Sequence, residues 1–155
     1  MKRLLAALVR EGRITLSEPR KTIARSALDR SERSLASARA VLGIGNPEDA
    51  IALAYYAMYY SARALLERVG VTCKNHTATP ILLSVFPIDT GTLEAARELR
   101  IDTQYSIDPT VTLEDATRLI MTAERFVADA YAIQATIANT EDVLNKIRAL
   151  LEVSP

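Results

Sequence analysis

The chain has 155 residues, which suits a single domain, and a fold of this size buries about two-thirds of the surface that its unfolded form exposes. Apolar residues make up 49% of it, whereas tryptophan is absent and phenylalanine occurs twice, so close-packed helices are favoured over a sheet built around aromatic residues. The net charge is zero. No stretch approaches the roughly twenty apolar residues of a membrane span, which excludes a membrane protein and predicts a soluble, cytoplasmic one.

The first forty residues predict an N-terminal arm, residues 1–16, and the first long helix. Within the arm, leucines and valine gather on one side of a short helix over residues 3–10, and Ile14 to Leu16 read as extended. Ser17 is expected to cap the next helix, with Pro19 in its first turn. Along that helix a seam of mostly small residues lets a neighbouring helix come close. The seam consists of Ala24, Leu28, Ser31, Leu35, Ala38 and Leu42.

Charge is distributed unevenly along the chain. Residues 1–39 hold ten Lys or Arg against four Asp or Glu, a balance of +6, and the remainder carries a balance of −6. The basic part is suited to a nucleic acid or an acidic partner surface. It is equally suited to neutralising the acidic remainder of its own fold or of a dimer mate, and both interpretations stay open.

A tyrosine-rich helix is predicted next. Asn46 at the cap with Pro47 behind it signals the start, and Gly70 is placed to end the helix. Tyr55 with Tyr59, and Tyr56 with Tyr60, are four residues apart, so two pairs of rings lie on neighbouring strips of one surface. The rings either pack in a core with their hydroxyls bonded to neighbouring helices, or leave one or two in a polar groove or a subunit contact.

The second half of the chain predicts further helices. After a polar loop over residues 71–80 come a short helix, a helix over about residues 91–104, and a break from Ser106 to Val111 that contains Asp108 and Pro109. Thr112 and Asp115 resemble a capping box for a last long helix, which Asn139 and Thr140 interrupt. We therefore expect an all-α fold, an antiparallel up-and-down bundle of four main helices with short extra ones.

His76 is the only histidine and Cys73 the only cysteine. This excludes a site with several histidines and an intramolecular disulfide, and we expect neither a metal nor a cofactor. Lys74, Asn75 and His76 precede a predicted helix, where free backbone amides favour an anion. The alternative is that His76 caps or braces this loop.

A second candidate cluster is Arg97 and Arg100, three residues apart on one helix face, with Tyr105 just after the helix. Arginine binds phosphate through paired hydrogen bonds and an aromatic ring stacks on a base, which points to a nucleotide or RNA. The alternative is local ion pairing with nearby carboxylates. These are Glu94, Glu98 and Asp102.

Over residues 20–135 the order of motifs resembles the HEPN family of prokaryotic helical-bundle proteins. The matching elements are Ala54-Tyr55-Tyr56-Ala57-Met58 with Tyr59 and Tyr60 behind it, Ala62-Arg63-Ala64-Leu65-Leu66, Lys74-Asn75-His76, Leu99-Arg100, Gln104-Tyr105 and a final helix with an acidic cap. The resemblance implies a four- or five-helix bundle, commonly dimeric, that binds nucleotides or RNA. It also implies a nucleotidyltransferase partner in a toxin and antitoxin pair, and some members are metal-independent endoribonucleases.

The ribonucleases of this family carry an arginine followed after four to six residues by a histidine. For His76 that arginine would fall at Val69, Gly70 or Val71. The first hypothesis is therefore a binding module, a homodimer without catalysis, with a site drawn from Lys74, Asn75, His76, Arg63, Arg97, Arg100 and Tyr105. The first alternative is a ribonuclease using His76 and Arg100, and the second is a purely structural homodimerisation unit.

Overall fold

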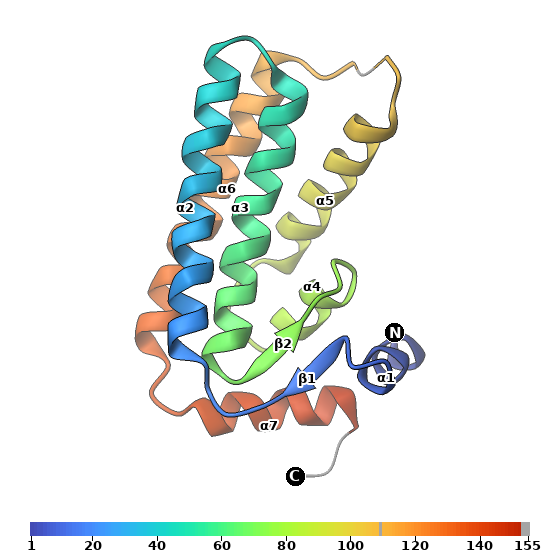
Figure 1. The fold of residues 1–155 in the computed structure, drawn as a ribbon, viewed down its shortest axis with the longest axis vertical. Helices are drawn as coiled ribbons and strands as arrows, with labels where there is room; N and C mark the ends of the chain where they lie inside the picture. Colours follow the sequence, from blue (N-terminus) through green and yellow to red (C-terminus); the bar gives the residue numbers. More distant parts are fainter. Residues whose placement is uncertain (109, 153–155) are drawn as a thin grey trace.

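The computed structural model describes residues 1–108 and 110–152, and this part of the chain forms seven helices and two short strands (Figure 1). In chain order they are α1 Lys2–Arg10, β1 Ile14–Leu16, α2 Lys21–Gly43, α3 Pro47–Arg68, β2 Val71–Cys73, α4 Ala78–Leu83, α5 Thr90–Tyr105, α6 Leu113–Thr136 and α7 Thr140–Leu151. The predicted break between α5 and α6 is present, although Pro109 itself lies outside the described residues. No helix in the described ranges is long and apolar enough to cross a membrane.

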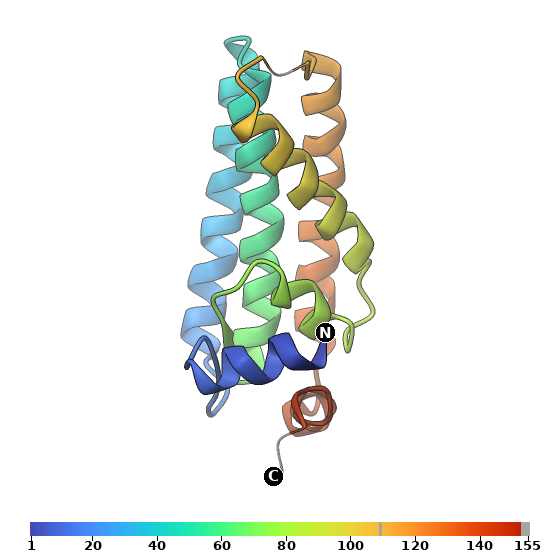
Figure 2. The same cartoon turned by 90° about the vertical axis from the view of Figure 1, so that its right-hand side faces the viewer.

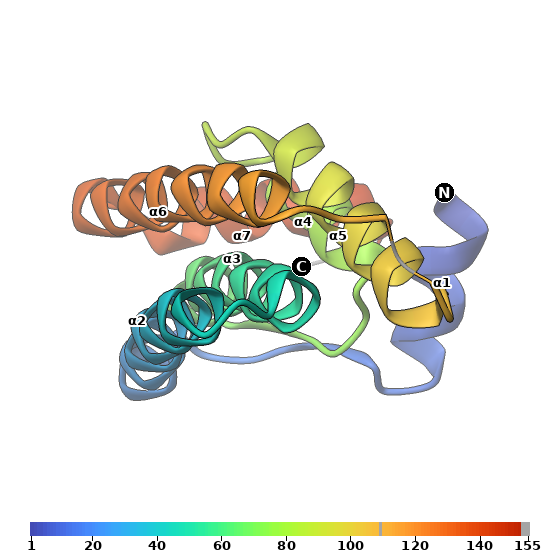
Figure 3. The same ribbon diagram turned by 90° about the horizontal axis from the view of Figure 1, so that it is seen from above.

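The four long helices α2, α3, α5 and α6 form the expected bundle, so the all-α prediction is confirmed. Seen from above, α2, α6 and α5 surround α3 on three sides (Figure 3), and α3 packs against all of them. The shorter α1 and α7 lie across the lower end of the bundle and contact each other (Figure 2). The tyrosine-rich helix is therefore the central element of the fold.

Burial along α3 follows from this central position. From Ala50 to Glu67 every residue is buried except four, and these four are spaced three, four and three residues apart. They are Leu53, Tyr56, Tyr60 and Arg63, which we call the α3 stripe. This spacing places them on one side of the helix, on the side that α2, α5 and α6 leave uncovered.

The helix boundaries largely follow the predicted capping signals. The Asn46 side chain accepts a backbone N–H group at the start of α3, and Thr112 with Asp115 forms a complete capping box on α6. The predicted interruption at Asn139 and Thr140 is present, and the Asn139 side chain caps α7 there. The small-residue seam of α2 is buried except for the half-buried Leu42, and the Ser31 hydroxyl donates to the Ala57 carbonyl of α3 at 2.7 Å. These local predictions are confirmed because capping depends on residues within one turn.

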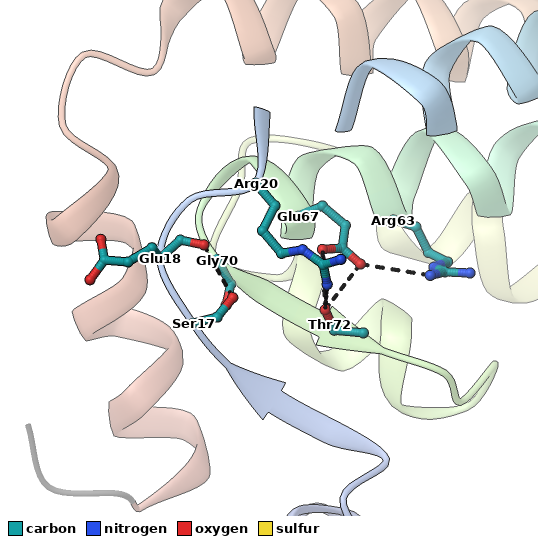
Figure 4. Close-up of polar contacts among 7 residues, drawn as sticks. All are labelled: Ser17, Glu18, Arg20, Arg63, Glu67, Gly70 and Thr72. Atoms are coloured by element: carbon teal, nitrogen blue, oxygen red, sulfur yellow. Dashed lines mark hydrogen bonds and ion pairs between the residues drawn. The ribbon is translucent and has the colours of Figure 1, made fainter. Parts of the chain in front are cut away.

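The predicted cap of α2 is wrong. The helix begins at Lys21 with Arg20 in the cap position and no side-chain cap, and Ser17 instead faces Gly70. The Ser17 N–H donates to the Gly70 carbonyl at 2.8 Å, and the Arg20 N–H donates to the Glu67 carbonyl at 2.9 Å. The helix starts later because the backbone of this segment is bonded to the end of α3 and to Gly70 behind it; Figure 4 shows Ser17 beside Gly70.

The loop predicted after Gly70 begins instead with a strand. Residues 71–73 form β2, buried and paired antiparallel with β1, so that Ile14 lies opposite Cys73 and Leu16 opposite Val71. The partner strand is more than fifty residues away in sequence, so local patterns do not report it. This pairing carries the chain from the lower end of α3 to the loop that contains His76.

Candidate functional site

His76 lies against the middle of α3, where three tyrosine rings hold it. Its ring stacks on Tyr59 with centroids 4.0 Å apart and planes inclined by 19°, and Tyr56 presents a nearly perpendicular ring at 6.1 Å. The Nδ1 atom of His76 is 2.6 Å from the hydroxyl oxygen of Tyr55. The imidazole is thus fixed on one face and at one nitrogen.

The protonation of this pair follows from its surroundings. Burial raises the pKa of Tyr55, so its hydroxyl keeps its proton. Burial, followed by the positive charges of Arg100, Arg97 and Arg63, lowers the pKa of His76 below its ordinary value, so the imidazole is neutral at pH 7. If the Tyr55 hydroxyl donates to Nδ1, Nε2 carries the ring N–H; if Nδ1 donates to Tyr55, Nε2 is an acceptor. Either tautomer leaves one nitrogen for an outside group.

Arg100 reaches the same cluster from α5. Its Nη1 donates to the Tyr56 hydroxyl at 3.3 Å and to the side-chain oxygen of Gln104 at 3.0 Å. The guanidinium carbon lies 5.0 Å from the Tyr55 ring centroid and 5.6 Å from that of Tyr56, a cation–π arrangement. The guanidinium is therefore held beside His76 by aromatic rings and neutral groups.

Three arginines near His76 lack part of their hydrogen bonding. The Nε atoms of Arg63, Arg97 and Arg100 are buried and have no hydrogen-bond partner among the described residues. In the same residues, neither Arg97 nor Arg100 pairs with Glu94, Glu98 or Asp102. A buried donor without a partner costs free energy, so such a cluster needs an explanation. We call His76, Arg63, Arg97 and Arg100 the His76 site.

Arg63 is the member of the site with a nearby carboxylate. Its Nη2 lies 3.7 Å from the buried Glu67 carboxylate, which also accepts a hydrogen bond from Thr72 and lies 3.5 Å from Arg20 (Figure 4). Glu67 is thus shared between two arginines and one hydroxyl. Positive charge remains in excess around His76 because Arg97 and Arg100 have no such partner in the described chain.

The remaining predicted site residues have other surroundings. The Asn75 side chain accepts from the N–H groups of Thr77 and Ala78, so these two amides at the start of α4 are already bonded and Asn75 braces the loop. Lys74 is exposed beside the site. Tyr105, at the end of α5, is 82% exposed and is not among the rings around His76.

The contacts of His76 with Tyr55, Tyr56 and Tyr59 were not assigned from the sequence, which treated these rings as a structural signature. The only sequence signal was the four-residue spacing that groups the rings on one side of the helix. Nothing in that spacing indicates which loop covers them. The fold therefore adds aromatic residues to the candidate site.

A hollow lies elsewhere, between α5 and α6. It has a volume of about 710 Å³ and is lined by short polar and apolar side chains such as Thr92, Leu99 and Thr122. Its arginine, Arg118, is already paired with Asp115. It offers neither a histidine nor an unpaired cation, so the His76 site is the better candidate for chemistry.

Because the chain has one histidine, the state of the site can be followed directly by NMR. We expect the His76 ring protons to titrate with a pKa below the ordinary 6.5 in a buffer without phosphate. Since the unfolded chain takes up this proton near pH 6.5 and the folded one only at lower pH, folding stability should fall as the pH drops through that window. His76→Gln should make stability less dependent on pH there.

The matched variants are Arg100→Gln, which should raise the pKa of His76, and Arg125→Gln on the exposed surface of α6, which should leave it unchanged. A wild-type His76 pKa at or above 6.5 would contradict the crowded, positively charged surroundings described above.

Comparison with known proteins identifies similar chains. The HEPN domain model matches residues 24–134, a span that begins in α2 and ends in α6 and includes every residue of the His76 site. A UPF0332 protein of Archaeoglobus fulgidus is 30% identical over 108 residues, which cover 65% of this chain and 86% of the relative. The match to the HEPN domain model covers most of the bundle and all of its central tyrosine helix.

Proposed function

Because the chain belongs to the HEPN domain family, we propose that it binds the phosphate of an RNA or a nucleotide at the His76 site and does not cleave it. The observation that supports this most directly is the convergence of Arg97 and Arg100 on a neutral histidine without a carboxylate partner among the described residues. A phosphate group supplies the missing negative charge.

The chemistry of the site suits a phosphate. A guanidinium group is planar and donates two parallel hydrogen bonds, which match two phosphate oxygens, and charge-assisted bonds of this kind are stronger than neutral ones. The rings of Tyr55, Tyr56 and Tyr59 exclude water from one side of the arginines, so their charge acts in a medium of lower polarity. Neutral His76 adds a donor or an acceptor at Nε2.

A second candidate is a metal-independent ribonuclease, favoured by the Tyr55–His76 hydrogen bond, which orients a neutral imidazole. In that reaction His76 takes the proton of a ribose 2′-hydroxyl, the oxygen attacks the adjacent phosphorus, and the bond to the 5′ oxygen breaks while an arginine stabilises the added negative charge. One copy of the chain has no second histidine to protonate the leaving oxygen, and it lacks the arginine that the family's ribonucleases carry four to six residues before their histidine. The missing arginine is why binding without cleavage is the first proposal.

One experiment addresses both candidates. Binding of a fluorescent RNA hexamer is measured by anisotropy in a buffer without phosphate at 50 to 300 mM salt, and the same mixtures are run on a denaturing gel. We expect saturable binding that weakens with salt, with a log–log slope of about −2 if three arginines contact phosphates, and intact RNA on the gel.

RNA cleavage products that form with the wild-type protein and not with His76→Ala would instead support the ribonuclease. Absence of binding for RNA and for adenine nucleotides at the lowest salt would contradict the proposal and leave the structural alternative.

A further inference from the structure

We propose that the ligand is a single strand of RNA, and that Tyr60 with Arg30 forms a second subsite that stacks a base next to the phosphate held at the His76 site. This inference rests on the proposed function and specifies its ligand. A mononucleotide occupies the first subsite only, whereas an oligonucleotide occupies both.

The second subsite continues the first along the α3 stripe. The Tyr60 ring lies 6.1 Å from Tyr56, with planes inclined by 27°, and 5.8 Å from Tyr59. Because His76 stacks on Tyr59 at 4.0 Å, the centroids of Tyr60 and His76 are at most 9.8 Å apart. Nucleotides in a stacked strand advance by about 3.4 Å each, so three to four nucleotides span both positions.

Arg30 places positive charge on the far side of Tyr60. It comes from α2, and its guanidinium carbon lies 4.2 Å from the Tyr60 ring centroid. Arg30 is exposed and pairs with no carboxylate in the described parts of the chain. Since the guanidinium covers this face of the Tyr60 ring, a base stacks on the outer face of the guanidinium, and arginine also attracts the phosphate backbone.

The two subsites lie on opposite sides of one uncovered surface. Arg30 borders it from α2, Arg97 and Arg100 border it from α5, and the α3 stripe forms its floor. A row of arginines with tyrosines between them is the pattern of surfaces that bind single strands, in which stacking tolerates any base. A duplex is a poorer fit because its bases are already paired and stacked on one another.

A second copy of the chain is a less suitable occupant. A two-fold symmetric contact applies the same patch of both copies to each other, so the arginines of both copies would be gathered into one contact. Like charges brought together in this way repel. A polyanion with aromatic bases complements both features of the surface.

The test compares hexa-adenylate RNA with adenosine 5′-monophosphate on the same protein. Anisotropy follows the hexamer, and shifts of the His76 ring protons follow the mononucleotide. We expect Tyr60→Leu to weaken hexamer binding roughly 5- to 100-fold, the usual range for losing one stacked base, and to leave the mononucleotide unaffected. Tyr60→Phe keeps the ring and should bind the hexamer within about twofold of wild type. Arg30→Gln should weaken binding of the hexamer and leave binding of the mononucleotide unchanged.

Two control variants make the same kinds of change outside the surface formed by the α3 stripe and its bordering arginines. Tyr131→Leu removes an exposed ring on α6, and Arg25→Gln removes a charge on the side of α2 that faces Tyr131. Both should bind the hexamer as wild type does. Duplex RNA of mixed sequence should bind more weakly than a single strand of that sequence.

The outcomes separate this inference from the proposed function. Equal affinity of wild type for the hexamer and the mononucleotide, or equal weakening of both by Tyr60→Leu, overturns the second subsite while the His76 site stands. Loss of a dimer in Tyr60→Leu, seen as a halved mass by light scattering with RNA affinity unchanged, also overturns it in favour of a second copy of the chain. No binding of either ligand overturns both.

Discussion

Gly70→Ala is expected to lower the free energy of unfolding by about 3 kcal/mol or more, a large part of the roughly 5–15 kcal/mol of a typical domain. Gly70 has a φ of +85°, where a side chain is strained by about 1–2 kcal/mol. An added Cβ would also lie only 2.0 Å from the Ser17 carbonyl oxygen (Figure 4). Because that oxygen belongs to the backbone leading out of β1, it cannot move aside without disturbing the strand pair.

Two other glycines separate the two causes. Gly45 has a φ of +82°, but a Cβ added there meets nothing within 4 Å, so Gly45→Ala should show the backbone strain alone. Gly43 has neither a positive φ nor an atom within 4 Å of an added Cβ. Urea unfolding followed by circular dichroism should rank the losses Gly70→Ala, Gly45→Ala and Gly43→Ala in decreasing order. If Gly70→Ala costs no more than Gly45→Ala, Ser17 does not approach Gly70 as described.

The second large effect concerns ligand binding. Replacing Arg97 and Arg100 together by glutamine is expected to weaken RNA binding at least ~100-fold, since each charge-assisted hydrogen bond to a phosphate contributes about 1.5–3 kcal/mol. The log–log slope with salt should become less negative by about 1.4, because two phosphate contacts are lost. Anisotropy titrations at several salt concentrations measure both quantities.

The matched control is the double variant Arg25→Gln with Arg33→Gln, which removes the same charge from exposed positions on α2. It should weaken binding by only a few-fold through the general field of the protein. Equal losses in the two double variants would contradict a specific site on α5.

The same arginine variant should not destabilise the protein. Arg97 and Arg100 each bury an Nε without a partner in the described residues, so their replacement removes an uncompensated cost that offsets the loss of the Arg100 hydrogen bonds to Tyr56 and Gln104. We expect its urea midpoint to be equal to or higher than that of wild type. Together with the loss of binding, this result would mark the two residues as functional and not structural.

The two tyrosine pairs of α3 differ in burial. Tyr55 and Tyr59 are buried and contact His76, while Tyr56 and Tyr60 are half-buried on the α3 stripe. The first pair lies in the core, one of the two interpretations from the sequence, and a role of the second pair in recognition is part of the proposal above. The four-residue spacing predicted the two pairs, and the surrounding helices decided which pair was covered.

The sequence by itself determined the class of the fold and most helix boundaries. Capping by Asn46, Thr112 and Asn139, the small-residue seam of α2 and the central place of the tyrosine helix depend on residues within a few turns of one another. Such contacts leave a periodic pattern in the chain. The order of motifs was also sufficient to indicate the HEPN family.

Only the tertiary structure decided the composition of the site. The Tyr55–His76 hydrogen bond spans 21 residues and the Arg100–Tyr56 bond spans 44, and no periodicity reports partners at such separations. The pairing of β1 with β2 carries the loop containing His76 onto α3, and the packing of α5 on α3 brings Arg97 and Arg100 beside it. No arginine lies four to six residues before His76 in the sequence. The arginines near His76 instead come from α5, as Arg97 and Arg100, and from α3, as Arg63.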